Sequence, residues 1–263
     1  MQFRQWLVTI SSVITVSALL AGAPFAEPPG HRGTATDEEF DDAAPEPPLP
    51  PGISQRVFIH LPRTYKPNHL GTCINTINST VNDYGLTGWR LPTGGVTWKL
   101  NPATVPSSVG ASTAVSALTD AFTTWTNADS QKVFVYWGST AVTRPRLDYV
   151  NAVLWGKVSR GAIAITYVWY YTSTGVIADV DTVFNSRYPW AVFNPANGEC
   201  QSTPDAYDVQ DIATHEFGHW VGLDDLYSST DRDLTMYGYG AGGELKKRTL
   251  GVGDMTGANA VAP

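Results

Sequence analysis

The stretch from Thr214 to Tyr227, THEFGHWVGLDDLY, constrains the fold more than any other part of the chain. His215 and His219 are four residues apart, and on an α-helix this spacing puts two side chains on one face, one turn apart. Apolar residues around them recur at helical spacing, which predicts a helix over residues 207–222. Two imidazoles placed in this way can share one metal ion, so the fold must bury this helix with its histidine face turned toward a metal site.

Zinc is the usual metal for neutral nitrogen ligands in a hydrolytic site. Glu216 follows the first histidine and is angled off the histidine face, so it is expected to reach a metal-bound water rather than the metal. Zinc lowers the pKa of such a water to about 7, and a neighbouring carboxylate can take its proton and later pass it to a leaving amine. Chance would produce H-E-x-x-H in on the order of one such chain in a hundred or fewer.

The third metal ligand has to be something other than histidine, because the chain has no histidine after His219. Gly222 can end the helix in a left-handed conformation, and the chain then turns back toward the metal. Asp225 is therefore the predicted third ligand, and we expect Asp224 to point elsewhere, toward a helix or loop amide. Glu244 is the alternative third ligand. Three further histidines are expected upstream of the sheet: His31, His60 and His69.

These residues resemble a known zinc signature. HEFGHWVGLDD is similar to the metzincin pattern H-E-x-x-H-x-x-G-x-x-H/D, with aspartate in the third place as in the snapalysin-like members. Met236, in LTMYGYG, matches the methionine that lies in a tight turn beneath the zinc of metzincins. The run over residues 178–190 before the zinc helix, and LGVGDMTGANAV after the methionine, resemble the matrixin-type catalytic domain across roughly residues 93–263.

The resemblance implies a secreted zinc endopeptidase with one catalytic Zn²⁺ and protein or peptide substrates. The substrate would lie extended above the zinc helix and pair with an edge strand near residues 162–171. Tyr239 and Tyr237, just after the methionine, are candidates for stabilising the oxyanion or lining a pocket. The second, structural zinc site of matrixins should be missing, because no histidine lies between His69 and His215. A cysteine-switch motif is absent, and Ca²⁺ is possible but not indicated by the sequence.

The remaining pattern predicts an α+β domain with one mixed, mostly parallel twisted sheet and helices against one side. The helices are a backing helix, the active-site helix and a C-terminal helix. The resemblance implies that this domain is a metzincin-like catalytic domain. The expected helices span residues 111–128, 207–222 and 249–261, and the expected strands span residues 57–61, 96–100, 132–138, 148–158, 162–171 and 176–185.

The N-terminal quarter of the chain divides into three parts. Residues 1–26 have one early base and a short apolar run followed by small residues, which is typical of a secretory signal peptide, with an uncleaved membrane anchor as the alternative. Residues 27–52 are rich in proline and hold seven acids and one base, which predicts a disordered linker or pro-segment. Residues 53–92 form an N-terminal extension before the catalytic domain of residues 93–263.

Charge and cysteine content limit the partners. Of the formal charge of −7, residues 27–52 contribute −6 and the first 26 residues +1, so residues 53–263 carry only −2. This near-neutral body has no basic stretch for nucleic acid, and we expect a monomer that leaves the membrane after signal cleavage. In an exported chain the two cysteines, Cys73 and Cys200, are predicted to form a disulfide; an inhibitory thiolate at Cys73 is the alternative.

One function from another class also fits the sequence. A secreted binding or adhesion domain could keep the zinc as a structural staple. Glu216 argues against it, because a purely structural site needs no base there.

Overall fold

The computed structural model describes residues 48–63, 79–159, 161–203 and 205–262. The predicted signal peptide, most of the predicted acidic segment, His31, His69 and Cys73 lie outside the described residues. Within the described part of the chain, no helix has both the length and the apolar composition needed to cross a bilayer.

The described residues form a main sheet of seven strands in the order β11–β1–β6–β7–β5–β3–β4. The strands β3, β4, β5 and β7 pair in parallel, β6 runs antiparallel to both β7 and β1, and β1 is parallel to β11. The predicted mixed, mostly parallel sheet is therefore confirmed. The strand bounds are Ile53–Pro62 for β1, Val96–Leu100 for β3, Phe134–Ser139 for β4, Ala152–Gly156 for β5, Ala164–Tyr171 for β6, Ile177–Asn185 for β7 and Tyr239–Gly240 for β11.

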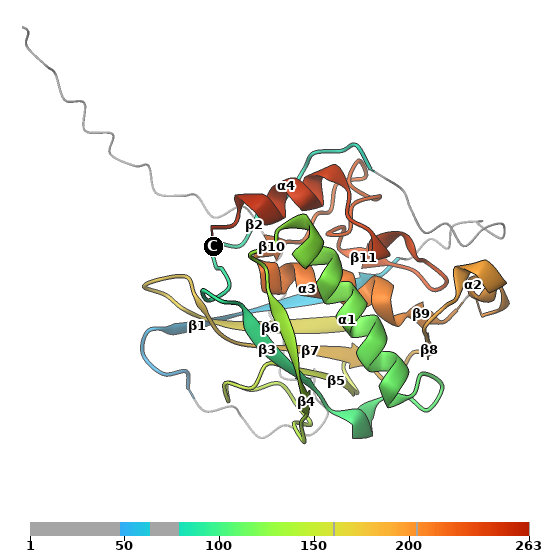
Figure 1. Ribbon diagram of the computed structural model, residues 1–263, viewed down its shortest axis with the longest axis horizontal. Helices are drawn as coiled ribbons and strands as arrows, with labels where there is room; N and C mark the ends of the chain where they lie inside the picture. The colour runs from blue at the N-terminus through green and yellow to red at the C-terminus, as the bar shows by residue number, and fades with distance from the viewer. Residues whose placement is uncertain (1–47, 64–78, 160, 204, 263) are drawn as a thin grey trace, which may run out of the picture. The chain divides into compact units, whose positions relative to one another are not determined.

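Three helices, α1, α3 and α4, lie on one side of this sheet (Figure 1). They span Ala111–Ala128, Val209–Val221 and Val252–Ala260. The rings of Phe122 in α1 and Phe217 in α3 are stacked with centroids 3.6 Å apart, and the Trp125 indole N–H donates to the carbonyl of Thr214 at 2.8 Å. These contacts hold α3 between α1 and the sheet. Twelve of the thirteen residues of α3 are buried.

Three side-chain hydrogen bonds fix the position of α3. The side chain of Asp208 caps its first turn by accepting from the amide of Asp211 at 2.8 Å. The Trp220 indole N–H donates to the hydroxyl of Thr182 on β7 at 2.9 Å, and the Trp89 indole donates to the carbonyl of His219 at 2.9 Å. The helix is thereby held at its start, along its sheet-facing side and at its end.

The short elements connect these layers. The pair of β2 and β10 joins the lead-in segment to the residues that follow α3. The bounds are Gly85–Leu86 for β2, Trp190–Ala191 for β8, Tyr207–Asp208 for β9, Leu223–Asp224 for β10, Glu199–Ser202 for α2, and Pro102–Thr104, Pro195–Asn197 and Lys246–Arg248 for the 3₁₀ helices η1, η2 and η3.

Several predicted bounds differ from the observed ones for local reasons. The helix predicted over residues 207–222 begins after Asp208, because that residue is the cap and pairs in β9. The strand predicted over residues 148–158 is reduced to β5, because the carboxylates of Asp179 and Asp181 accept hydrogen bonds from the backbone N–H groups of residues 146, 148, 149 and 152 and hold the first part as a loop. The helix predicted over residues 249–261 starts at Val252.

The expectation that His60 lies upstream of the sheet is wrong. The strand predicted over residues 57–61 is the ten-residue β1, and it lies inside the sheet, between β6 and β11. Its register pairs His60 with Ala164, more than one hundred residues away. A pairing at such sequence distance leaves no local pattern, so the sequence could predict the strand but not its place.

Cys200 lies in α2, is buried and takes part in a disulfide. The chain has only one other cysteine, Cys73, which lies outside the described residues, so the pairing of Cys73 with Cys200 stays a prediction.

Candidate metal centre

The two histidines of α3 are held by backbone carbonyls. The Nδ1 atom of His215 lies 2.8 Å from the carbonyl oxygen of Thr235, and Nδ1 of His219 lies 2.9 Å from that of Leu223. Because a carbonyl can only accept, each Nδ1 must carry the hydrogen, which leaves the lone pair on Nε2. Both rings are therefore oriented and protonated as metal-ligating histidines usually are.

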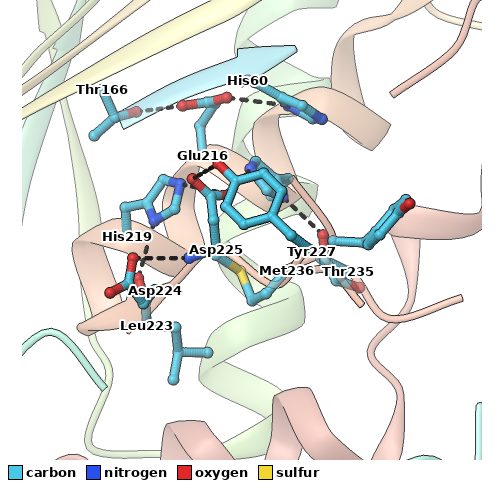
Figure 2. A network of polar contacts seen from close by, with 12 residues as sticks. His60, Thr166, Glu216, His219, Leu223, Asp224, Asp225, Tyr227, Thr235 and Met236 are labelled. Atoms are coloured by element: carbon cyan, nitrogen blue, oxygen red, sulfur yellow. Dashed lines mark hydrogen bonds and ion pairs between the residues drawn. The ribbon is translucent and has the colours of Figure 1, made fainter. Parts of the chain in front are cut away.

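Gly222 ends α3 and brings Asp225 back to these rings. Its φ of 117° is left-handed, a conformation that glycine adopts without strain. After this reversal, Oδ1 of Asp225 lies 3.2 Å from Nε2 of His215 and 3.7 Å from Nε2 of His219. Figure 2 shows Asp225 beside His219, with Met236 below it.

The ligand atoms of this group fit a metal ion. Nε2 of His215, Nε2 of His219 and Oδ1 of Asp225 are all buried and have no hydrogen-bond partner among the described residues. Buried polar atoms are normally paired, so three orphan atoms converging at one point indicate a missing shared partner. Two imidazole nitrogens and one carboxylate oxygen are a donor set that zinc accepts.

Burial shifts the pKa of each of the three candidate ligands. It lowers the pKa of His215 well below its usual range and the pKa of His219 to about 4, so both rings are neutral near pH 7. Burial raises the pKa of Asp225 and so disfavours its ionised form; a positive charge beside it, such as a metal ion, would restore the carboxylate.

Asp224 faces away from the metal group. Its carboxylate pairs with the guanidinium of Arg56 at 3.1 Å and accepts a hydrogen bond from the amide of Asp225 at 3.0 Å. The other sequence alternative, Glu244, accepts from the amide of Ala241 at 3.1 Å and pairs with Lys246 at 3.2 Å. Neither carboxylate belongs to the group formed by His215, His219 and Asp225.

Glu216 lies on the same helix, and its two carboxylate oxygens have different partners. Oε2 accepts a hydrogen bond of 2.6 Å from the hydroxyl of Thr166 on β6, and Oε1 lies 3.2 Å from Nδ1 of His60 on β1 (Figure 2). The side chain is fully buried, and burial raises its pKa to about 8. Ligand atoms of Glu216, His215 and His60 lie within 4.8 Å of one another, so the carboxylate stands next to the metal group.

Met236 lies under the metal group in a turn that α4 holds in place. The carboxylate of Asp254 accepts from the amides of Thr235 at 2.8 Å and Met236 at 3.0 Å. Gly218 lets the methionine approach α3, since a Cβ at that position would stand 2.1 Å from the methionine sulfur. The same turn supplies the carbonyl of Thr235 that orients His215, so the methionine and a metal ligand are positioned together.

The tyrosines near the site have separate environments. The hydroxyl of Tyr227 donates to Oδ2 of Asp225 at 3.2 Å, which orients the predicted third ligand. Tyr239 belongs to β11, and its ring packs against Tyr227 and Tyr237 with centroids 5.5 Å and 5.4 Å away. Lys247 and Arg63 lie against the ring of Tyr237.

Sequence reasoning missed His60, Thr166 and Tyr227 as residues of this site. Tyr227 is two residues from Asp225, and that proximity was the available signal. The other two reach Glu216 only through the pairing of β1 with β6, for which the sequence has no local signal.

A scan against protein-family models gave no match, and a search of curated proteins found no similar sequence.

Proposed function

We propose that the chain is a zinc-dependent endopeptidase of the metzincin type, matrixin-like in layout and with a snapalysin-like aspartate as third ligand, that is exported from the cell. The observation that carries the proposal is the convergence of three orphan buried ligand atoms, from His215, His219 and Asp225, beside the carboxylate of Glu216. When bound there, zinc supplies a Lewis acid that polarises a carbonyl and activates water.

The protein's own residues supply positioning and proton transfer. Glu216 would take a proton from the attacking water and pass it to the leaving amine, and the hydroxyl of Thr166 on β6 would hold its carboxylate in position during both steps. The pKa of Glu216, which burial raises to about 8, lies within about one unit of pH 7, as suits a group that must both accept and return a proton.

A binding domain with a structural zinc is the second candidate, and one observation favours it. His215, Glu216 and His219 are all fully buried, as in a closed structural site. An ordered base beside the ligands has no role in such a site, so the peptidase is the better supported function.

Peptide cleavage separates the two candidates. The purified protein is incubated with a mixed peptide library, with and without a chelator, and the cuts are mapped by mass spectrometry. A peptidase cleaves only without the chelator, and the Glu216→Ala variant, which retains the ligands, serves as the matched control. A binding domain yields the same peptide spectrum in all three samples. A peptidase whose metal group is covered would give the same result, so the library is also tested on protein from which β1 has been released, as described in the next subsection.

A further inference from the structure

The metal group is covered by a segment of the same chain. In β1, the ring of Phe58 stacks on His219 with centroids 3.9 Å apart, and the ring of His60 lies 3.8 Å from that of His215. His60 also contacts Glu216. A substrate could not reach these groups while β1 is in place.

The strand β1 fills a gap between two backbone edges. On one side it pairs with β6 in antiparallel register from Ile53 opposite Tyr171 to His60 opposite Ala164. On the other side, the amides of Leu61 and Arg63 donate to the carbonyls of Gly238 and Gly240 at 3.1 Å and 2.7 Å. Without β1, these edges would present unpaired backbone groups beside the metal site, which is how a sheet accepts an extended peptide.

The burial of β1 differs from that of a permanent core strand. In β1 only Phe58 and His60 are buried, and both face the metal group, whereas its other residues are partly exposed. The neighbouring β6 is buried over its first six residues. In addition, Nε2 of His60 is buried without a hydrogen-bond partner among the described residues, which is costly in a core.

We propose that β1 is an intramolecular occupant of the peptide-binding site, and that the site opens when this strand leaves. The proposal rests on the peptidase function for its consequence in activity, but the occupancy itself can be tested by binding. The gap between β6 and β11 then accepts an extended peptide in the direction that β1 now takes.

The side chains of β1 indicate which peptides fit. Arg56 pairs with Asp224 and lies over the rings of Phe58 and Trp89 at 4.9 Å and 5.4 Å. Phe58 packs edge to face on Trp89, with ring centroids 5.4 Å apart, as well as on His219. The site thus fits a peptide with a basic residue two positions before an aromatic one.

The first test releases β1 from the full-length protein. A recognition sequence for a specific protease is inserted after Arg63, and the cut protein is washed to remove the N-terminal piece. A tethered strand competes at an effective concentration near the millimolar range, so peptide hydrolysis should rise on the order of 100-fold after release. The synthetic peptide ISQRVFIHLP should bind the released protein and inhibit it, and its Arg56→Ala and Phe58→Ala versions should bind more weakly.

A second test loosens β1 without cutting. Arg56→Glu in the full chain replaces the ion pair with Asp224 by a repulsion at a partly exposed position, so hydrogen exchange of β1 amides and peptide hydrolysis should both increase. Gln55→Glu is the matched control: it adds the same charge to the next residue of the strand, for which the structure describes no side-chain contact with the metal group, and should change neither.

The outcomes distinguish a failure of β1 as an occupant from a failure of the peptidase function. If the intact protein hydrolyses peptides as fast as the released protein, β1 is not an occupant, although the peptidase stands. If the body unfolds after release, or loses a zinc ion that it held before, β1 is a permanent part of the core and the proposal is overturned. If the released protein binds ISQRVFIHLP but cleaves nothing, the occupancy holds and the peptidase function fails.

Discussion

At the scale of single residues, Asp225 and Asp224 are adjacent but serve different partners. Asp225 faces two imidazoles, whereas Asp224 pairs with Arg56 at the edge of the site. Asp225→Ala should lower zinc affinity by more than the 10–100-fold typical of losing an outer-shell partner, measured by competition with a chromogenic chelator. Asp225→His should retain zinc, because imidazole is also a zinc ligand.

The control at the neighbouring position is Asp224→Ala, which should bind zinc as the parent does. If Asp224→Ala or Glu244→Ala loses zinc while Asp225→Ala does not, the ligand set is wrong.

Substitution of Glu216 should reduce peptide hydrolysis without reducing zinc binding, unlike substitution of a metal ligand. Glu216→Ala leaves both histidines and Asp225 in place, so zinc content should stay close to that of the parent. Peptide hydrolysis by the β1-released protein should fall by about 10²–10⁴-fold, because proton transfer contributes on that order. Equal hydrolysis by parent and variant would remove Glu216 from the reaction.

At the scale of elements, the end of α3 decides where Asp225 lies. At Gly222 a Cβ would meet the carbonyl oxygen of Trp89 at 2.6 Å, in addition to the left-handed φ. Gly222→Ala should therefore lower the free energy of unfolding by more than about 1 kcal/mol and weaken zinc binding, measured by denaturant unfolding and by zinc competition.

Gly110 offers the matched control for this substitution. It has φ of 76° with nothing within 4 Å of the added Cβ, so Gly110→Ala incurs only the backbone strain. Zinc affinity should be unchanged in Gly110→Ala. If Gly222→Ala also keeps parental stability and zinc affinity, the reversal at Gly222 does not position Asp225.

The sequence could predict elements whose pattern is local. The helix over residues 111–128 agrees with α1 at both ends, because its apolar residues recur without interruption and Asp129 leaves the helical conformation. The approach of Asp225 to the histidines was also expected, since Gly222 and the spacing lie within one short stretch. Contacts between distant strands were not accessible: the side-chain period of a strand does not identify its partner, so His60 could not be placed at Glu216.

At the scale of the whole molecule, buried acids should make stability depend on pH. Burial raises the pKa of Asp179 from 3.8 to about 6. The unfolded chain releases this proton near pH 3.8 while the folded state keeps it up to about pH 6, so stability from this group is present at low pH and is lost as pH rises through that window.

Asp179→Asn separates the effect of the buried acids Asp179 and Asp181 from that of the buried histidines, whose lowered pKa values act in the opposite direction; the charge of Asp179 also raises the pKa of Asp181, so the variant removes that contribution as well. Relative to the variant, the parent should lose about 2 kcal/mol of unfolding free energy between pH 4 and pH 7, measured by denaturant unfolding at each pH. The asparagine keeps one of the two acceptor oxygens, so the variant loses some of the three backbone hydrogen bonds of Asp179, and the comparison uses the change with pH rather than the absolute stability. Parallel stability curves for the two proteins would contradict the buried, proton-holding state of Asp179.

The most direct test of the account is the position of zinc itself. Crystals of the protein, grown after extensive dialysis, are measured on both sides of the zinc absorption edge. The account predicts a single anomalous peak per chain, bounded by Nε2 of His215, Nε2 of His219 and Oδ1 of Asp225, the atoms that are now buried without partners among the described residues. A crystal with no zinc peak at this point, or with its zinc held by other residues, would contradict it.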